Sequence, residues 1–286
     1  MPHETQALGW QLRSQLTLHS PEFRLGKNLL YEVPDREINE GGPQRGVVHL
    51  KVTHHSKTVS EGTGFLIDDE VVVTAAHLLI PRHGPRRYDP AIAVSVSAGI
   101  GGDTVERRQG TWALVHMKWV ANYSYLNDVG LIRLSGIFHG VTPLPYKTTP
   151  LSDGGLTGVA YGYPENNHMD GIRLYQSQSL FWFAGGDMLL HEADTDHGSS
   201  GSPFIIDDNG EKSVIAIHSC GHAVNGSHIN KATPLNHNGN DMGVLLHIVK
   251  YMMRSPIGHR IRVSQNGRPF TAVVISTMDG YTTYGW

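Results

Sequence analysis

The stretch Asp194–Pro203, with the sequence DTDHGSSGSP, is dense in small residues. Glycine and serine at this density let a backbone turn sharply and leave its N–H groups pointing outward. This geometry suits a plain turn between strands, and it suits an anion-binding seat for a reactive serine equally well. The composition of the stretch leaves both interpretations open, so the rest of the chain has to decide between them.

The overall composition is that of a folded, turn-rich protein. The chain has 286 residues, of which 39% are hydrophobic and 17% are charged, with 33 glycines and 15 prolines. Disordered and coiled-coil chains have different profiles. The formal net charge is −3 and the basic residues are scattered. No basic face is therefore available for a phosphate backbone, and we expect no nucleic-acid partner.

Hydrophobic runs and cysteine content bear on the cellular environment. No run approaches the roughly 18 apolar residues that would span a bilayer, so we expect no membrane association. The first residues lack the apolar segment of a secretory signal. Cys220 is the only cysteine, so no intrachain disulfide can form and packing must supply the stability. We expect a cytoplasmic protein, or a secreted one if a leader is missing from this sequence.

Short β-like runs separated by turn-forming residues follow one another along most of the chain. One series extends from Val47 to Leu134 and a second from Leu156 to Ile229, with a proline-containing connection between them. Such spacing is typical of all-β barrels and sandwiches. The sequence therefore predicts two similar β units in tandem.

These patterns divide the chain into four parts. We expect residues 1–45 to form an N-terminal arm or pro-segment outside the core. Residues 46–141 form the first β unit, residues 142–240 the second, and residues 241–286 a C-terminal part.

The C-terminal part contains two patterns. Apolar residues recur at helical spacing from Met242 to Met253, which predicts an amphipathic helix packed on the domain. Two β-like runs, Arg260–Ser264 and Phe270–Ser276, lie on either side of Asn266-Gly267, a pair typical of a two-residue hairpin turn. We expect a small hairpin there and have no functional explanation for it.

Three short segments each place a potentially catalytic residue beside a β-like run. His77 ends the segment VTAAH, Asp128 lies in LNDVGLI, and Ser200 lies in GSSGSP. A serine hydroxyl becomes a good nucleophile when a histidine takes its proton, and the histidine works best when a carboxylate fixes its tautomer. Each residue alone is more often an ordinary core or turn residue, but their joint occurrence favours a catalytic site.

These segments resemble the T-A-A-H, N-D-[IV]-x-L-[IL] and G-x-S-G motifs of the chymotrypsin-like serine proteases, in that family's order. The resemblance implies an all-β fold of two tandem antiparallel barrels with the site between them. It implies that His77 is the general base, Asp128 its orienting partner and Ser200 the nucleophile. The backbone N–H groups of Gly198 and Ser200 would form the oxyanion hole. It also implies a protein or peptide substrate and no cofactor.

Within that family the chain is most similar to the glutamyl endopeptidases, because GSSGSP has Ser-Pro where digestive trypsins have Gly-Pro, and no disulfide cysteines accompany it. The resemblance implies that Thr195 and His218 line the primary pocket and hold a glutamate carboxylate. A hydroxyl and an imidazole N–H offer two donors without burying a permanent positive charge. Further agreements with that family are Pro34-Asp35-Arg36, Gly162-Tyr163-Pro164 and Ile217.

Other residues near the expected site receive roles from the same resemblance. Ser219, Cys220 and Gly221 would pair with the substrate backbone as an edge strand. His197 would lie at the rim of the pocket, although a solvent-facing imidazole is an equally good interpretation.

Ser199 and Ser202 are rival nucleophiles in the same loop, but the resemblance aligns Ser200 with the family's serine. We expect the Ser199 side chain to point away from the site. In some glutamyl endopeptidases a new N-terminal amine completes the pocket after a pro-segment is removed. The corresponding position here is near Leu29.

Several alternatives stay open at this point. The chain could be a catalytically silent protease fold that only binds, or a serine protease with a different primary specificity. His218, Cys220 and His222 alternate and would face one side of a strand, but H-x-C-x-H lacks the separated ligand pairs of a structural zinc site. We therefore expect no metal, and the sequence leaves the oligomeric state unknown.

Overall fold

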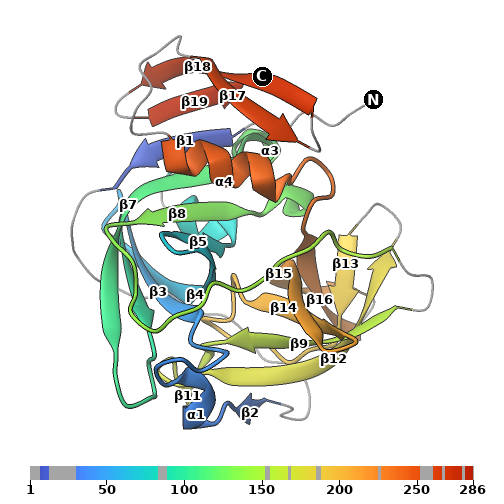
Figure 1. Cartoon of the computed structure of the whole chain (residues 1–286). Coiled ribbons are helices and arrows are strands. Elements are labelled where there is room, and N and C mark those ends of the chain that lie inside the picture. The colour runs from blue at the N-terminus through green and yellow to red at the C-terminus, as the bar shows by residue number, and fades with distance from the viewer. Residues whose placement is uncertain are drawn as a thin grey trace.

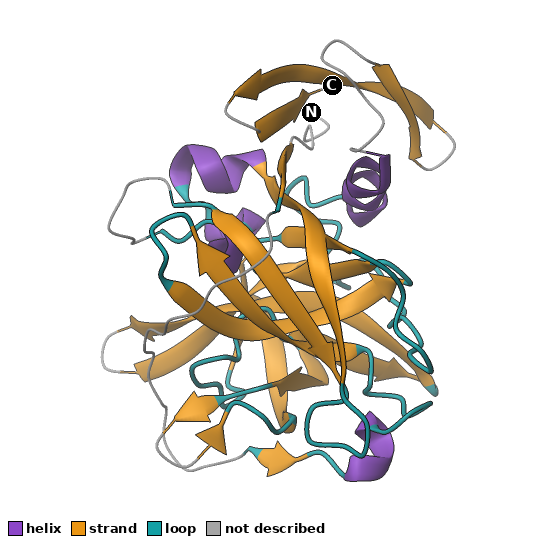
Figure 2. Cartoon of the chain, turned by 90° about the vertical axis from the view of Figure 1, so that its left-hand side faces the viewer, coloured by secondary structure: helices purple, strands orange, loops and turns teal. Residues whose placement is uncertain are grey.

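The computed structural model describes residues 7–12, 30–82, 89–151, 155–166, 169–184, 188–224, 227–251, 260–265, 268–278 and 281–285. Antiparallel strands dominate these residues and the helices are few and short (Figure 2). In this part of the chain no helix is long and apolar enough to cross a membrane.

Six antiparallel strands close the first barrel, in the order β3, β4, β5, β8, β7, β6 and back to β3 (Figure 1). Residues at alternate positions, such as Val48, Leu50 and Val52 in β3, belong to one buried cluster because side chains alternate across a strand. The strands are β3 (Val47–His54), β4 (Val59–Asp68), β5 (Val71–Thr74), β6 (Ala91–Ala98), β7 (Glu106–His116) and β8 (Gly130–Leu134).

The second barrel closes in the same way, in the order β9, β12, β13, β16, β15, β14 and back to β9. Phe181 and Phe204 meet edge to face inside it, with their ring centroids 4.6 Å apart. Two tandem antiparallel barrels are thus confirmed. The strands are β9 (Leu156–Gly162), β12 (Tyr175–Ala184), β13 (Met188–His191), β14 (Pro203–Asp208), β15 (Glu211–Val224) and β16 (Ser227–Pro234).

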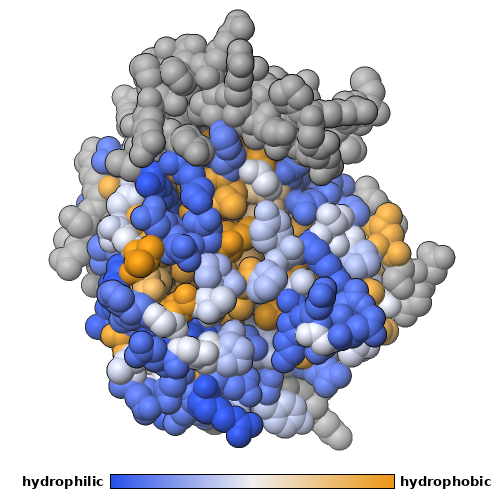
Figure 3. Space-filling model, viewed as in Figure 1, coloured by the Kyte–Doolittle hydropathy of each residue, from blue (hydrophilic) through white to orange (hydrophobic). Residues whose placement is uncertain are grey.

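The proline-containing connection runs between the barrels across the face seen in Figure 1. Leu144 N donates to Leu66 O in the first barrel at 2.8 Å, and Val214 N donates to Pro145 O from the second barrel at 2.8 Å. Figure 3 shows apolar residues gathered near the centre of this face within a hydrophilic rim. The connection therefore ties the two barrels together, while the limits assigned to each β unit stay a prediction.

The expected C-terminal helix is present as α4 (Met242–Tyr251), which packs beside β8 (Figure 1). Asp241 Oδ1 caps its first turn by accepting from Val244 N at 2.9 Å. The apolar stripe of Met242, Leu245 and Val249 is buried, as its spacing predicts. The last expected helical residues, up to Met253, lie outside the described residues.

The expected hairpin is also present, as β17 (Arg260–Gln265) and β18 (Arg268–Met278). Gln265 pairs with Arg268, which leaves a two-residue connection at Asn266-Gly267, itself outside the described residues. The sequence did not predict that a third strand, β19 (Tyr281–Gly285), follows in the same sheet.

Part of the expected N-terminal arm lies in the core. The strand β1 (Ala7–Gln11) pairs with β7 of the first barrel on one side and with β19 on the other. Trp10 is buried, and its indole N–H donates to Ala91 O at 2.7 Å. The apolar run is too short to stand out among polar neighbours, and its partners are distant in the sequence.

The remaining elements are short. The strand β2 (Tyr31–Glu32) pairs with β12 at the edge of the second barrel's sheet. The strands β10 (Glu165–Asn166) and β11 (Met169–Asp170) form a separate two-stranded sheet. The short helices are α1 (Asp35–Ile38), α2 (Ala76–Leu79), α3 (Met117–Asn122) and the 3₁₀ turn η1 (Tyr125–Asn127).

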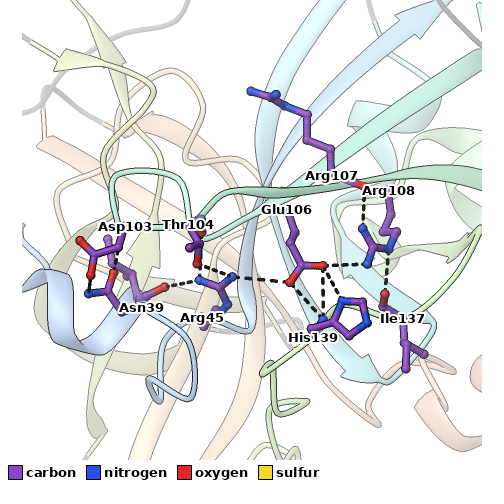
Figure 4. A network of polar contacts seen from close by, with 10 residues as sticks. Asn39, Arg45, Asp103, Thr104, Glu106, Arg107, Arg108, Ile137 and His139 are labelled. Carbon is purple, nitrogen blue, oxygen red and sulfur yellow. Dashed lines mark hydrogen bonds and ion pairs between the residues drawn. The ribbon is translucent and has the colours of Figure 1, made fainter.

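A buried arginine fixes the chain where it enters the first barrel (Figure 4). Nη1 of Arg45 donates to Ile38 O and Thr104 O, both at 3.1 Å, and Nη2 lies 3.7 Å from Glu106 Oε1. Glu106 also binds His139, at 3.1 Å. A buried guanidinium needs such partners, because an unpaired charge is costly in the interior. This network holds α1 against the β6–β7 connection.

His116 gives the fold a predicted dependence on pH. Its Nδ1 accepts from Lys118 N at 3.1 Å, and its Nε2 lies 3.2 Å from Gly239 O. Burial lowers the pKa of His116 to about 4, with the charge of Lys118 adding to the effect. An unfolded histidine titrates near 6.5, so below that pH the unfolded chain takes up a proton that the folded chain excludes.

We therefore predict that His116 lowers the free energy of unfolding by about 2 kcal/mol between pH 7.5 and pH 5. His116→Asn keeps a capping acceptor and removes the titrating group. Between pH 7.5 and pH 5, the free energy of unfolding of this variant should therefore fall by about 2 kcal/mol less than that of the wild type. Urea unfolding at both pH values measures the difference. Equal losses in the two proteins would contradict the prediction.

Candidate active site

The first barrel contributes an imidazole and a carboxylate. His77 lies on α2, directly after β5, and Asp128 follows η1 at the entry to β8. His77 N donates to Asp128 Oδ1 at 2.8 Å, and His77 Nδ1 lies 2.7 Å from Asp128 Oδ2. The Asp128 side chain is fully buried, whereas that of His77 is 19% exposed. The carboxylate thus fixes both the backbone and the ring of the histidine.

A third donor reaches the same carboxylate from the second barrel. Ser219 Oγ donates a hydrogen bond to Asp128 Oδ2, and Ser219 is itself buried. Sequence reasoning placed Ser219 in the substrate-binding edge and missed this contact. Ser219 and Asp128 are far apart in the sequence, so no local pattern predicts a hydrogen bond between them.

The nucleophile loop brings Ser200 to the other nitrogen of the imidazole, with Ser200 Oγ 2.8 Å from His77 Nε2. Ser199 Oγ instead accepts from Asp196 N at 3.1 Å, so it points away from the site as expected. Ser202 Oγ is buried and has no hydrogen-bond partner in the described part of the chain. Of the three serines, Ser200 is the one whose hydroxyl is hydrogen-bonded to the His77 ring.

Two glycines shape this loop. Gly198 and Gly201 have φ values of +78° and +87°, which favour glycine. A Cβ would lie 2.2 Å from Tyr163 O at Gly198, and 2.1 Å from Thr63 O at Gly201. The loop can therefore pack against β4 and the end of β9 only with glycine at both positions.

The N–H groups of Gly198 and Ser200 have no acceptor within the described residues. The carbonyls of the same two peptide groups are held on the other side, because His197 O accepts from Glu165 N at 2.6 Å and Ser199 O accepts from Ser202 N at 3.0 Å. In a trans peptide the N–H points opposite to the carbonyl. Both N–H groups are therefore oriented and free to receive an oxyanion.

Thr63 in β4 supports this loop with both its backbone and its side chain. Thr63 N donates to Ser200 O at 2.8 Å, and Thr63 Oγ1 donates to Gly198 O at 2.7 Å. Thr63 Oγ1 also accepts from Tyr163 N at 3.0 Å. Thr63 is a positioning residue that sequence reasoning missed.

The expected pocket residue His218 is joined to the nucleophile loop by two backbone bonds. His218 N donates to Ser202 O at 2.8 Å, and Gly201 N donates to His218 O at 2.9 Å. Burial lowers the pKa of His218 to about 3, the charge of His77 adds to this effect, and Asp128 opposes it. The ring is therefore neutral at physiological pH.

Other expected pocket residues differ in their surroundings. Thr195 is buried, and no hydrogen bond joins it to His218 in the described residues. His197 is partly buried, and burial lowers its pKa. Leu29, where a new N-terminus was expected, lies outside the described residues.

A second buried histidine, His191 of β13, lies behind His218, with its Nε2 3.2 Å from His218 Nδ1. Burial keeps the pKa of His191 well below its usual value. Sequence reasoning missed His191, because only the pairing of β13 with β16 brings it to the pocket.

On the side of β15 that faces β14, strand pairing ends before the segment Ser219–Gly221. β14 pairs with β15 only as far as Ile217, so in the described residues no strand occupies that side of the segment. On its other side the segment pairs with β16, with a bulge between His218 and Cys220. A peptide in extended conformation can add to a sheet at a strand segment of this kind.

No group of three or more histidine, cysteine or acidic residues in the described structure could hold a metal ion. The side chain of His222, one of the three alternating residues, lies outside the description.

Comparison with known proteins identifies the family. A family model described as the trypsin-like peptidase domain matches residues 62–217, a range that contains His77, Asp128 and Ser200. The chain belongs to this trypsin-like peptidase family. No curated protein sequence matches the chain significantly.

Solved structures of similar proteases agree in fold. The protease Anisep from Arthrobacter nicotinovorans is 15% identical with a TM-score of 0.56, over 66% of this chain and 90% of that one. The thermostable serine protease AL20 from an extremophilic microorganism is 14% identical with a TM-score of 0.58, over 71% and 98%. A Glu endopeptidase is 16% identical with a TM-score of 0.60, over 81% and 99%. At these identities the likeness shows the chymotrypsin-like fold alone.

We predict that Thr63→Val slows labelling of Ser200 by a fluorophosphonate probe roughly tenfold, because Gly198 O loses its donor and the oxyanion N–H groups lose their alignment. Thr63→Ser keeps the hydroxyl and should label within about twofold of the wild type. The second-order labelling rate of each protein is the measurement. A Thr63→Val protein that labels as fast as the wild type would show that the loop holds its shape without the hydroxyl.

Proposed function

We propose that this peptidase is a serine endopeptidase that hydrolyses peptide bonds through an acyl-enzyme on Ser200. The observation that carries the proposal is the continuous hydrogen-bonded series from Ser200 Oγ to His77 Nε2, at 2.8 Å, and from His77 Nδ1 to Asp128 Oδ2, at 2.7 Å.

In the proposed mechanism His77 takes the Ser200 proton as Oγ attacks the substrate carbonyl. The Asp128 carboxylate stabilises the imidazolium, and the Gly198 and Ser200 N–H groups stabilise the oxyanion. His77 then gives its proton to the leaving amine. A water molecule, activated by the same histidine, hydrolyses the acyl-enzyme and releases Ser200.

For primary specificity we propose glutamate, and less readily aspartate, at the residue before the scissile bond. Support comes from the buried Thr195 and His218, the latter fixed to the nucleophile loop. A hydroxyl and a neutral imidazole can both donate to one carboxylate. The shorter aspartate side chain would reach less far toward them.

The rival proposal is a catalytically silent binding module with the same barrels. A silent relative has no need to keep Ser200 Oγ, His77 and Asp128 in hydrogen-bonding reach of one another, so their arrangement favours the endopeptidase. The two proposals differ in whether Ser200 reacts.

We predict that Ser200→Ala abolishes both cleavage of a peptide library and fluorophosphonate labelling, because the nucleophile is removed. Ser202→Ala, a buried serine in the same loop, is the matched control and should keep both activities. Mass spectrometry of the labelled protein locates the modified residue. Labelling that persists in Ser200→Ala would reject the mechanism.

We also predict that His218→Ala lowers the preference for a glutamate peptide over an otherwise identical leucine peptide by tenfold or more, because a buried carboxylate loses a donor. Labelling by a fluorophosphonate should change much less, since the backbone bonds of residue 218 remain. The ratio of kcat/KM for the two peptides is the measurement. An unchanged ratio would remove His218 from the pocket.

A further inference from the structure

Asn230 of β16 lies among the elements that carry the proposed primary pocket. It pairs directly with Gly221 of β15 on one side and with His191 of β13 on the other. Directly opposite residues of antiparallel strands point to the same face. His218 pairs with Ala232, two residues further along β16, so Asn230 and His218 share that face.

The side-chain amide of Asn230 has a defined orientation. Its Nδ2 donates to Ala193 O at 2.8 Å, which identifies the other terminal atom as the oxygen. Ala193 precedes the pocket residue Thr195 by two positions. The amide nitrogen thus fastens the Thr195 segment to β16.

The amide oxygen is an unused acceptor. Asn230 is 1% exposed, and its Oδ1 has no hydrogen-bond partner in the described residues. The oxygen lies 3.2 Å from the position that a Cβ on Gly221 would take. Gly221 belongs to the segment proposed to bind the substrate backbone, so Oδ1 lies directly beside that segment.

A buried acceptor without a donor is unfavourable, so a bound group that donates to it is favoured. A carboxylate offers only acceptors, whereas a carboxamide offers an N–H₂ donor together with a carbonyl acceptor. His218 and Thr195 can donate to the oxygen of either group. The three residues together match a side chain that both donates and accepts.

We infer that Asn230 Oδ1 is the third polar group of the primary pocket, and that it admits the side-chain carboxamide of glutamine alongside the carboxylate of glutamate. The inference rests on the proposed function and makes it more specific. The neutrality of His218 agrees with it, because a neutral ring adds no fixed positive charge that would favour the carboxylate of glutamate over the uncharged carboxamide of glutamine.

Two quenched peptides that differ only in glutamate or glutamine before the scissile bond test the inference. We would measure kcat/KM for both, at pH 7.5, with the wild type, Asn230→Ala and Asn230→Asp. Lys231→Ala is the matched control, since it changes the adjacent residue on the opposite face of β16. The glutamine-to-glutamate ratio within each protein is independent of the active fraction, which fluorophosphonate titration gives separately.

We expect the wild type to cleave both peptides and Asn230→Ala to lower the glutamine-to-glutamate ratio about tenfold. Asn230→Asp should raise the ratio, because its carboxylate accepts from the amide and repels glutamate. Opposite changes in the two variants are a result that a merely structural role would not produce. Lys231→Ala should leave the ratio unchanged.

The inference is overturned if the wild type cleaves only the glutamate peptide, or if the ratio is the same in all four proteins. A shared ratio would mean that an internal water satisfies Oδ1. If Asn230→Ala fails to fold, Asn230→Asp decides alone. The inference is then overturned if the glutamine-to-glutamate ratio of Asn230→Asp does not rise above that of the wild type. Failure of the proposed function looks different, because then neither peptide is cleaved and Ser200 is not labelled.

Discussion

The buried carboxylate of Asp128 is the constraint on which the site depends. Ionised carboxylates are costly to bury unless donors surround them, and here three groups do so: His77 N, His77 Nδ1 and Ser219 Oγ. Two of these donors come from the first barrel and one from the second. The hydrogen bonds to this one side chain therefore link the two barrels and orient the imidazole toward Ser200.

The loop that carries Ser200 depends on backbone geometry more than on side chains. Its glycines approach Tyr163 O and Thr63 O too closely for any Cβ. The carbonyls of His197 and Ser199 are engaged, so the N–H groups of Gly198 and Ser200 point to the opposite side, where we propose that an oxyanion binds. The preorganisation of this space is a property of the fold before any substrate arrives.

The pocket region uses burial in a different way. Desolvation keeps the pKa of both His191 and His218 low, so the two rings meet as neutral groups at 3.2 Å. Asn230 adds an oriented amide to the same face of the sheet. A pocket of this composition would select its ligand by the positions of donors and acceptors, and charge would have little part in the selection.

The sequence by itself determined the alternation of strands, the C-terminal helix and hairpin, and the three segments around His77, Asp128 and Ser200, because each of these has a local signal in residue order or spacing. The tertiary structure alone decided the strand β1, the Ser219 contact, and the positions of Thr63, His191 and Asn230 around the site. Their partners lie far away along the chain, as with Thr63 and Gly198. Such contacts follow from strand register and barrel closure, and the local sequence indicates neither.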